Sequence, residues 1–265
     1  MGNKTALISL VGDDAAGRYI MDFCAENNID TSGVCVDASI DTSINIGLVR
    51  EDGERTFLSS RSGSQWKMSL EHVDFEMFPG AKLLTLASIF NNPLLDNDTL
   101  VKIFRAAKEH GLIICADMIK NRFGEKLADI REALPYLDYF FPNYEEASAL
   151  TGIAEIESIA DALLGCGVKN VVIKNGRQGC FIKTGSEAIT VPAYLGAVVA
   201  DAIGAGDNFV AGFITAILEG TELATCAQYA NVVASISVES MGATSGVKSR
   251  GQVDERYTRQ KEGAL

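Results

Sequence analysis

Residues 198 to 220 read Val-Val-Ala-Asp-Ala-Ile-Gly-Ala-Gly-Asp-Asn-Phe-Val-Ala-Gly-Phe-Ile-Thr-Ala-Ile-Leu-Glu-Gly. A short apolar run leads into a turn of very small residues at 204–206. From Asn208 onward, apolar side chains recur at helical spacing, and Gly220 stands where a helix usually ends. The stretch therefore predicts a small-residue turn that opens onto a helix, with Asp207 in the first helical turn.

This turn has the composition of an anion-binding site. Free amides at a helix N-terminus carry partial positive charge and attract phosphate, and Gly204, Ala205 and Gly206 let a ligand approach the backbone. Asp207 is placed to accept a proton from a hydroxyl that attacks the phosphate. Together these features indicate phosphoryl transfer to an alcohol. The alternative is that the small residues serve tight packing and that Asp207 only caps the helix.

Two other phosphate-binding loops are excluded by spacing. A dinucleotide fingerprint, G-x-G-x-x-G, requires glycine where Phe209 stands. A Walker A loop occurs nowhere in the chain, and residues 242–249, which come nearest, have the wrong spacing.

Residues 201–207, Asp-Ala-Ile-Gly-Ala-Gly-Asp, resemble the signature D-T-x-G-A-G-D of the ribokinase (PfkB) family of small-molecule kinases, with Ala202 in place of threonine. The resemblance implies one ribokinase-like domain over residues 1–265, a three-layer α/β/α sandwich with a mostly parallel sheet and a small antiparallel β lid. It implies ATP-dependent phosphorylation of a hydroxyl group on a sugar or sugar-like molecule. In that reaction Asp207 would be the base, and the amides of the Gly204–Ala205–Gly206 turn would form the anion hole.

Composition limits the class of protein. With 265 residues, 47% of them hydrophobic, the chain is long enough for one large α/β domain. A net charge of −12 argues against nucleic-acid and membrane-surface partners. The six cysteines are scattered, as in a reducing cytosol, and neither a membrane span nor a signal peptide is predicted. We therefore expect a cytoplasmic protein.

The N-terminal part predicts a strand over residues 5–11, followed by a helix that Asp13 and Asp14 begin and that runs to about Asn27. Residues 11–18, Val-Gly-Asp-Asp-Ala-Ala-Gly-Arg, are similar to the family pattern V-G-x-D-x-x-G. Family members carry a first strand, lid strands and a glycine-rich segment before the strand at residues 5–11, whereas only residues 1–4 precede that strand here. The expectation is a fragment or variant, or a chain numbered from within a longer one, which leaves the substrate site open.

Residues 33–60 alternate polar and apolar side chains, which predicts a small antiparallel sheet with a turn at residues 51–54. In the family this would be the lid that closes over the sugar, and a homodimer through the lid is a further implication. The alternative is an edge hairpin without a ligand role.

From residue 82 the chain alternates strands (83–87, 112–116, 139–141) with helices (96–110, 125–134), which predicts a parallel sheet with ligands at its carboxyl edge. Asp117 follows the second of these strands. Asp117 and Arg122 resemble the family's substrate motif D-x-N-x-R, although the spacing is one residue longer. The resemblance makes both candidate substrate ligands.

Asn143 and Glu146 occupy the first and fourth positions of a capping box, which explains them without a ligand. They also match the family motif N-x-x-E, which implies that Asn143 serves the nucleotide and that Glu146 handles Mg²⁺ through water. Both interpretations can hold together.

The nucleotide half of the family site is implied by residues 174–179, which fit the pattern K-x-G-x-x-G through Lys174, Gly176 and Gly179. Lys174 would place a positive charge near the phosphates, or else is a solvated strand end. Asn231, eleven residues before Gly242, has the spacing of an adenine-side residue. A monovalent cation such as K⁺ would take its oxygen ligands from Asp201, Ile203 and Gly242.

The sequence also leaves two other classes of function open. A non-catalytic ligand-binding or regulatory protein on the same fold is favoured by Ala202 and by the N-terminal segment that this sequence lacks relative to the family, and is opposed by Asp207. An NAD-dependent enzyme has only the α/β pattern in its favour. The acceptor could be a pentose, a hexose, a keto-deoxy acid or a nucleoside. The last fifteen residues are charged and are expected to fray.

Overall fold

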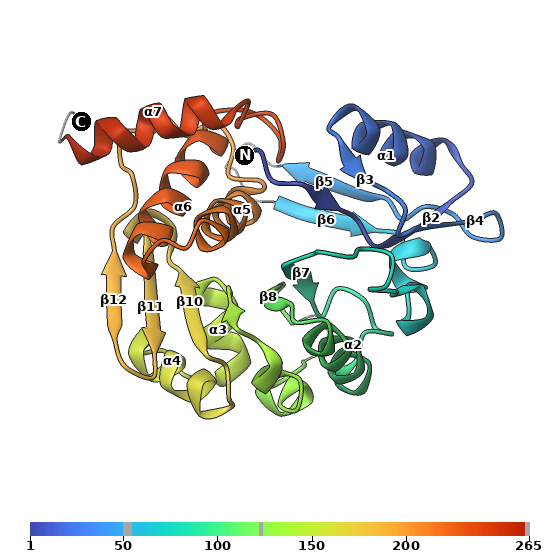
Figure 1. Ribbon diagram of the computed structural model, residues 1–265, viewed down its shortest axis with the longest axis horizontal. Coiled ribbons are helices and arrows are strands. Elements are labelled where there is room, and N and C mark those ends of the chain that lie inside the picture. The colour runs from blue at the N-terminus through green and yellow to red at the C-terminus, as the bar shows by residue number, and fades with distance from the viewer. Residues whose placement is uncertain (50–54, 122–123, 263–265) are drawn as a thin grey trace.

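The computed structural model describes residues 1–49, 55–121 and 124–262. A six-stranded sheet forms its centre, in the order β12-β11-β10-β9-β8-β7 (Figure 1). The strands β7 to β10 are parallel, and β11 and β12 extend the sheet antiparallel. The strand bounds are β7 (Leu83–Ile89), β8 (Ile113–Met118), β9 (Tyr139–Phe140), β10 (Asn170–Lys174), β11 (Cys180–Thr184) and β12 (Ala188–Val191).

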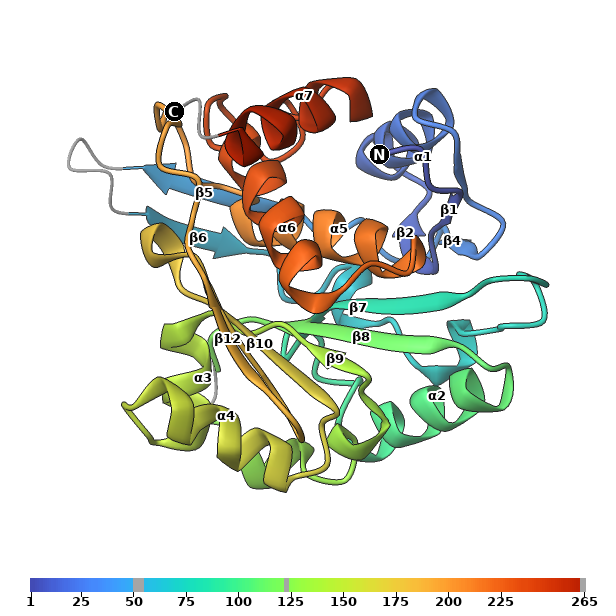
Figure 2. The same cartoon turned by 60° about the vertical axis from the view of Figure 1, so that its left-hand side comes forward.

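Helices cover both faces of this sheet (Figure 2). One face carries α2 (Asn97–Glu109), α3 (Tyr144–Thr151) and α4 (Ile156–Gly165). The opposite face carries α5 (Ala205–Leu218), α6 (Leu223–Ser237) and α7 (Arg250–Lys261). The predicted three-layer α/β/α sandwich is therefore confirmed.

Successive residues of the chain supply the two separate cores between these layers. Phe140 is fully buried in the cluster beneath α2, α3 and α4, whereas its neighbour Phe141 is fully buried in the cluster beneath α5 and α6. On β10, Ile173 belongs to the first of these clusters and its neighbour Val172 to the second. Side chains alternate between the faces of a strand, so an apolar run without alternation fills both cores.

The N-terminal part forms two small parallel pairs. β1 (Thr5–Ala6) pairs with β3 (Ile29–Asp30), and β2 (Ser9–Gly12) pairs with β4 (Val34–Asp37). Between them α1 (Ala15–Glu26) begins at Asp14, whose carboxylate accepts a hydrogen bond from the Gly17 amide at 2.7 Å. The predicted strand and capped helix are confirmed, although the strand is interrupted after Ala6.

The antiparallel sheet is smaller than the alternation at residues 33–60 predicted. Among the described residues of this segment, only β5 (Asn45–Val49) and β6 (Arg55–Ser59) pair as an antiparallel hairpin. The expectation that residues 33–37 belong to the same antiparallel sheet is wrong, because β4 lies parallel to β2. Alternation identifies a strand with one wet face but not its partner. The predicted turn at residues 51–54 lies outside the described residues.

The base of the hairpin is tied to the connection between β2 and α1. The Thr42 amide donates to Asp14 Oδ2 at 2.7 Å, and the Gly12 amide donates to Thr42 Oγ1 at 2.9 Å. The Thr42 side chain is buried here, and the two hydrogen bonds fix the start of the segment that leads into the hairpin.

Two other expectations are wrong. Residues 125–134 do not form one helix but 3₁₀ turns at Leu127–Ile130 and Leu134–Tyr136, and Pro135 stands in the first positions of the second turn, where its missing amide hydrogen breaks no hydrogen bond. Residues Arg250–Lys261 form α7, so the expectation that this segment frays is wrong. Val253 is fully buried there, and the Tyr229 hydroxyl donates to Asp254 Oδ1 at 2.9 Å, so packing against α6 orders a polar helix.

A search of residues 1–49, 55–121 and 124–262 finds no helix with the length and apolar character needed to cross a membrane.

Candidate active site

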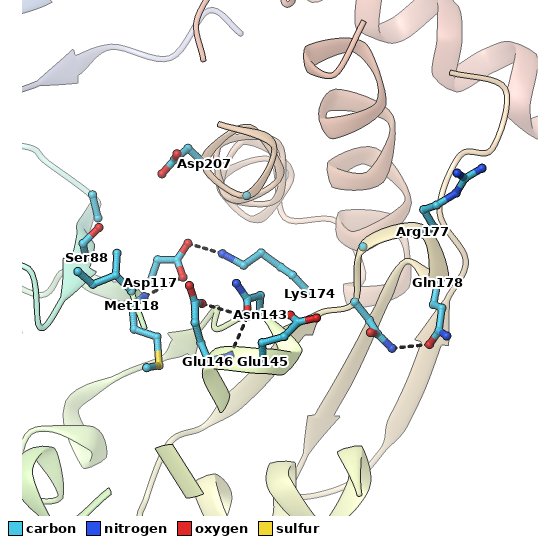
Figure 3. A pocket seen from close by; sticks show the side chains of 15 residues that line it. Ser88, Asp117, Met118, Asn143, Glu145, Glu146, Lys174, Arg177, Gln178 and Asp207 are labelled. Carbon is cyan, nitrogen blue, oxygen red and sulfur yellow. Dashed lines mark hydrogen bonds and ion pairs between the residues drawn. The ribbon is translucent and has the colours of Figure 1, made fainter. Parts of the chain in front are cut away.

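A cavity of about 640 Å³ opens at the carboxyl ends of β7, β8 and β10, next to the start of α5 (Figure 3). Parallel strands place their carboxyl ends at one edge of the sheet, where ligands usually bind. Seven of the residues predicted from the sequence line this cavity. They are Asp117, Asn143, Glu146, Lys174, Gly176, Gly206 and Asp207.

The start of α5 is held in place by Gly204 and Asn208. Gly204 has a φ of +76°, which favours glycine, and a Cβ atom there would lie 2.6 Å from the Cβ of Ala243. The Asn208 side-chain amide donates to the carbonyl oxygens of Gly204 at 2.8 Å and of Ala243 at 2.9 Å. The helix N-terminus is thereby fixed against the turn at residues 242–243.

Asp207 lies in the first turn of α5 and projects toward the side of the cavity that contains Ser88 and Asp117 (Figure 3). Its side chain is exposed to the cavity. In the part of the chain that the structure describes, the Asp207 carboxylate has neither a hydrogen-bond donor nor an ion-pair partner. The carboxylate can therefore accept a proton or a hydroxyl group without first breaking a contact within the protein.

Lys174, at the end of β10, forms an ion pair with Asp117, which lies near the end of β8. The Lys174 side chain is 12% exposed and that of Asp117 is 9% exposed, so the interpretation of Lys174 as a solvated strand end is wrong. Burial raises the pKa of the Asp117 carboxyl, while the Lys174 ammonium opposes this rise and the Asp207 charge adds to it.

Lys174 also reaches the start of α5. A Cβ atom added to Gly206 would lie 3.2 Å from Lys174 Nζ, so the ammonium group is next to the helix N-terminus. A positive charge and the amides of a helix terminus therefore border the same part of the cavity, as the binding of a phosphate requires.

Asn143 and Glu146 form the predicted capping box at the start of α3. The Glu146 amide donates to Asn143 Oδ1 at 2.8 Å, and the Asn143 amide donates to Glu146 Oε2 at 2.9 Å. The backbones of Asn143 and Lys174 form an isolated parallel β-bridge, so the capping box lies beside the end of β10 at the cavity wall. Burial raises the pKa of Glu146 from 4.5 to about 7, although its hydrogen bond from Asn143 favours the charged form.

Four other predicted residues, Asp201, Ile203, Asn231 and Gly242, are not among those that line the cavity. Asp201 Oδ1 accepts from the Ile203 amide and Oδ2 from the Gly242 amide, both at 2.9 Å, so the structure brings these three residues together next to the start of α5. Asn231 is buried on α6 and donates to the Pro192 carbonyl at 3.0 Å.

The other predicted positions have different surroundings. A Cβ atom at Gly179, where φ is +93°, would lie 2.0 Å from the Val191 carbonyl oxygen, so this glycine permits a tight turn. Ala205 is the first residue of α5 and is not among the residues that line the cavity. Arg122 lies outside the described residues.

Sequence reasoning missed part of the wall. Ala87 and Ser88 lie near the carboxyl end of β7. The rule that ligands bind at the carboxyl ends of parallel strands, which identified Asp117, would have identified them as well. Met118, Ile119 and Asn175 lie at the ends of β8 and β10, so the same rule would have found them too. Glu145, Arg177 and Gln178 carry no such signal in the sequence.

Comparison with known proteins identifies a family. The family model described as "pfkB family carbohydrate kinase" matches residues 1–250. An uncharacterized sugar kinase of Archaeoglobus fulgidus is 28% identical over 252 residues, which cover 93% of this chain and 96% of the relative. A nucleoside kinase of Methanothermobacter thermautotrophicus is 26% identical over 260 residues, which cover 98% of this chain and 81% of the relative.

A solved structure agrees with these matches. The ribokinase of Arabidopsis thaliana, complexed with ribose and ATP, superposes with a TM-score of 0.82 at 25% identity and covers 96% of this chain and 82% of its own. The family match spans nearly the whole chain and includes the turn at residues 204–206 with Asp207. This chain belongs to the pfkB family of carbohydrate kinases.

Proposed function

We propose that this protein transfers the γ-phosphoryl group of ATP to a hydroxyl group of a sugar or sugar-like acceptor, with Asp207 as the general base. The chain is a carbohydrate kinase by family, and relatives and neighbours of known name bind ATP or act on sugars and nucleosides. The observation that carries the assignment of roles is the position of the Asp207 carboxylate on the first turn of α5, in the same cavity as Lys174 and without a partner among the described residues.

In this proposal the acceptor lies between Asp207 and the γ-phosphoryl group. Asp207 removes the hydroxyl proton as the acceptor oxygen forms a bond to phosphorus, and the bond from phosphorus to the bridging oxygen of ADP breaks. The amides of the turn at residues 204–206 and the Lys174 ammonium stabilise the charge on the phosphoryl oxygens. These groups are already in place before the reaction, because Gly204 and Asn208 fix the start of α5.

A magnesium ion fits the chemistry of this cavity. Glu146 presents a carboxylate in the wall, and in the described part of the chain its Oε1 atom has no hydrogen-bond partner. Mg²⁺ prefers oxygen ligands and keeps several of its waters, so one carboxylate with the phosphates suffices to hold it. When bound, Mg²⁺ would neutralise charge on the phosphates. Glu146 would hold it through water, and Asn143 would orient Glu146.

The nucleotide side is assigned to the turn after β10. Gly176 lines the cavity together with Arg177 and Gln178, and this arrangement supports contact with the phosphates or the ribose of ATP. Gly179 and Asn231 would act indirectly, because both contact the end of β12 and shape the loop that follows it.

The acceptor side is assigned to Asp117 and Arg122, and Ser88 at the end of β7 extends it. Asp117 lies in the wall near Asp207, and its pairing with Lys174 holds the carboxylate where a sugar hydroxyl can donate to it.

A monovalent cation such as K⁺ is a further part of the proposal. The Asp201 carboxylate and the carbonyl oxygens of Ile203 and Gly242 would be its ligands, at the back of the phosphate site. The clustering of these residues around the Asp201 carboxylate, next to the start of α5, supports this proposal.

The β5–β6 hairpin supports a homodimer. Ile46 lies directly opposite Leu58, and the side chains of Ile44, Ile46, Leu48 and Leu58 are half-exposed. Clustered apolar side chains on a surface hairpin are typical of an interface. In the proposed dimer the hairpins of two copies would pack on each other and close over the acceptor.

The proposed activity is tested by ADP release from ATP and Mg²⁺ with a panel of pentoses, hexoses, keto-deoxy sugar acids and nucleosides, against a control without acceptor. Release that depends on one acceptor class supports the proposal and identifies the substrate. ATP binding without ADP release from any acceptor would contradict it and favour a non-catalytic binding protein.

A further inference from the structure

The C-terminal helix α7 lies almost entirely beyond the family match, which ends at residue 250. It packs along α6 and passes beside the loop that connects β12 to α5 (Figures 1 and 2). This loop, residues 192–203, leads directly into Gly204 and the proposed phosphate site. A helix outside the matched region therefore touches a segment that the proposed reaction needs.

Arg256 makes this contact. Its guanidinium carbon lies 5.1 Å from the centre of the Tyr194 ring, within the range of a cation–π interaction. One nitrogen, Nη1, donates to Ser235 Oγ at 3.2 Å, and the other, Nη2, donates to Glu239 Oε2 at 2.7 Å. The Arg256 side chain is 21% exposed. One arginine thus joins the β12–α5 loop, the end of α6 and the segment after α6.

Tyr194 transmits this contact along its own loop. A Cβ atom added to Gly196 would lie 2.9 Å from the Tyr194 ring, so the chain folds tightly against the ring that Arg256 covers. If the ring moves, the backbone at Gly196 loses the surface against which it packs. The loop conformation between Tyr194 and Asp201 then loses its support.

The segment after α6 is linked to the same loop. Glu239 follows Val238, whose carbonyl oxygen accepts hydrogen bonds from the amides of Ala200 at 2.8 Å and Asp201 at 3.1 Å. Asp201 in turn accepts from the Gly242 amide at 2.9 Å. The two segments that Arg256 holds are therefore hydrogen-bonded to each other immediately before α5 begins.

We propose that Arg256 is a positioning residue for nucleotide binding. Through Tyr194 and Glu239 it fixes the two segments that place Gly204 and the amides at the start of α5. This inference rests on the proposed function, because it assumes that these amides bind the phosphates of ATP. Arg256 itself lies outside the cavity wall and is not proposed to touch ATP.

The matched control is Arg259, one turn further along the same helix. Arg259 is 64% exposed and pairs with Glu255, which lies four residues earlier and is equally exposed. Arg259→Met therefore removes the same charge from the same helix without touching either segment. Arg256→Lys is the conservative variant, since an ammonium can stack on Tyr194 or bind Glu239 but lacks the planar fork that reaches Ser235 as well.

The experiment measures Mg-ATP binding by calorimetry and steady-state kinetics with the best acceptor, using the full chain. Arg256→Met is expected to raise the Kd and the KM for ATP about tenfold, because coupling through a packed network changes binding by about this factor. The KM for the acceptor stays unchanged. Arg259→Met behaves like the unmodified protein, and Arg256→Lys falls between.

A second variant keeps the test sound if Arg256→Met folds poorly. Tyr194→Leu removes the ring at the other end of the contact and is expected to weaken ATP binding in the same direction. Combining both changes should be no worse than the stronger single change, since both act on one contact.

The inference is overturned if Arg256→Met and Arg259→Met bind ATP equally well, whatever their thermal stability. It is also overturned if both KM values rise together, because that result indicates a general loss of structure. The binding measurement does not depend on turnover, so it decides the role of Arg256 even if the chain releases no ADP. Absence of ADP release would count against the proposed function alone.

Discussion

Lys174 Nζ lies between the Asp117 carboxylate, with which it forms an ion pair, and Gly206 at the start of α5. The ammonium group therefore borders both the proposed acceptor side and the proposed phosphate side of the cavity. It also separates the charge of Asp117 from the helix terminus that is to bind an anion. We expect this single cation to control both stability and nucleotide affinity.

Replacing Lys174 by methionine leaves a buried carboxylate without its cation. The variant is expected to lose about 3 kcal/mol of unfolding free energy, because a buried ion pair that loses one partner leaves an uncompensated charge. It is also expected to bind ATP more weakly. Urea unfolding and calorimetry check the two effects.

Lys183→Met is the control, since Lys183 on β11 pairs with the exposed carboxylates of Glu157 and Asp161 and should lose less than about 1 kcal/mol. Equal losses in the two variants would show that the Lys174–Asp117 pair has no special role. Unchanged ATP affinity in Lys174→Met would remove Lys174 from the phosphate site.

The carboxyl group of Glu146 gives a dependence on pH. Burial raises its pKa to about 7, so between roughly pH 5 and 7 the folded protein keeps a proton that the unfolded chain has released. Unfolding then releases protons, and the unfolding free energy falls as the pH rises through this window. Glu146→Gln keeps the capping box but cannot titrate.

The comparison of the two proteins by urea unfolding at pH 5.5 and pH 8.5 tests this dependence. Glu146→Gln should gain roughly 2 kcal/mol relative to the unmodified protein between these pH values. A constant difference between them would show that Glu146 titrates normally. Mg²⁺-dependent ATP binding should strengthen with pH over the same range, since the ion requires the charged carboxylate.

Gly206→Val tests the anion hole. The new side chain would meet Lys174 Nζ and stand where a phosphate must approach the amides. Gly206 lies within α5 and does not have a positive φ, so the backbone there accepts a side chain. We therefore expect a folded protein whose affinity for ATP falls at least about tenfold. Gly185→Val, in a turn where a Cβ atom meets nothing within 4 Å, should bind ATP normally. Unchanged affinity in Gly206→Val would contradict the assignment.

The proposed dimer is tested at the β5–β6 hairpin. Leu58→Lys places a charge directly opposite Ile46 in the apolar surface and should convert a dimer to a monomer in sedimentation velocity. Leu70→Lys, which changes an exposed leucine outside the hairpin, should leave the association unchanged. A monomer at all concentrations before any substitution would rule out the hairpin interface.

Much of the fold follows from local patterns. The apolar runs around Phe140 and Ile173 predict strands buried on both faces, and the two cores confirm this. Asn143 and Glu146 predict a helix start by their spacing alone, and the structure has it there. Gly204, Gly206 and Asp207 predict the turn and the helix start, because small residues allow a tight turn and a carboxylate is favoured in the first helical turn, and the structure has both.

The rest depends on contacts between distant parts of the chain. Asp117 and Lys174 are 57 residues apart, and only the positions of β8 and β10 within one parallel sheet bring them together. The polar sequence of α7 predicts fraying until the buried Val253 and the hydrogen bond from Tyr229 are known. Residues 34–37 show a strand but not that their partner is β2.

The most direct test of the central claim is the effect of Asp207→Asn on turnover and on ATP binding, measured on the same preparation. Asparagine keeps the size of the side chain but cannot accept the hydroxyl proton. The account predicts that kcat falls by about 10²- to 10⁴-fold, the usual contribution of a general base, while the Kd for Mg-ATP stays nearly unchanged. Turnover close to that of the unmodified protein would contradict the account, because Asp207 could not then be the base.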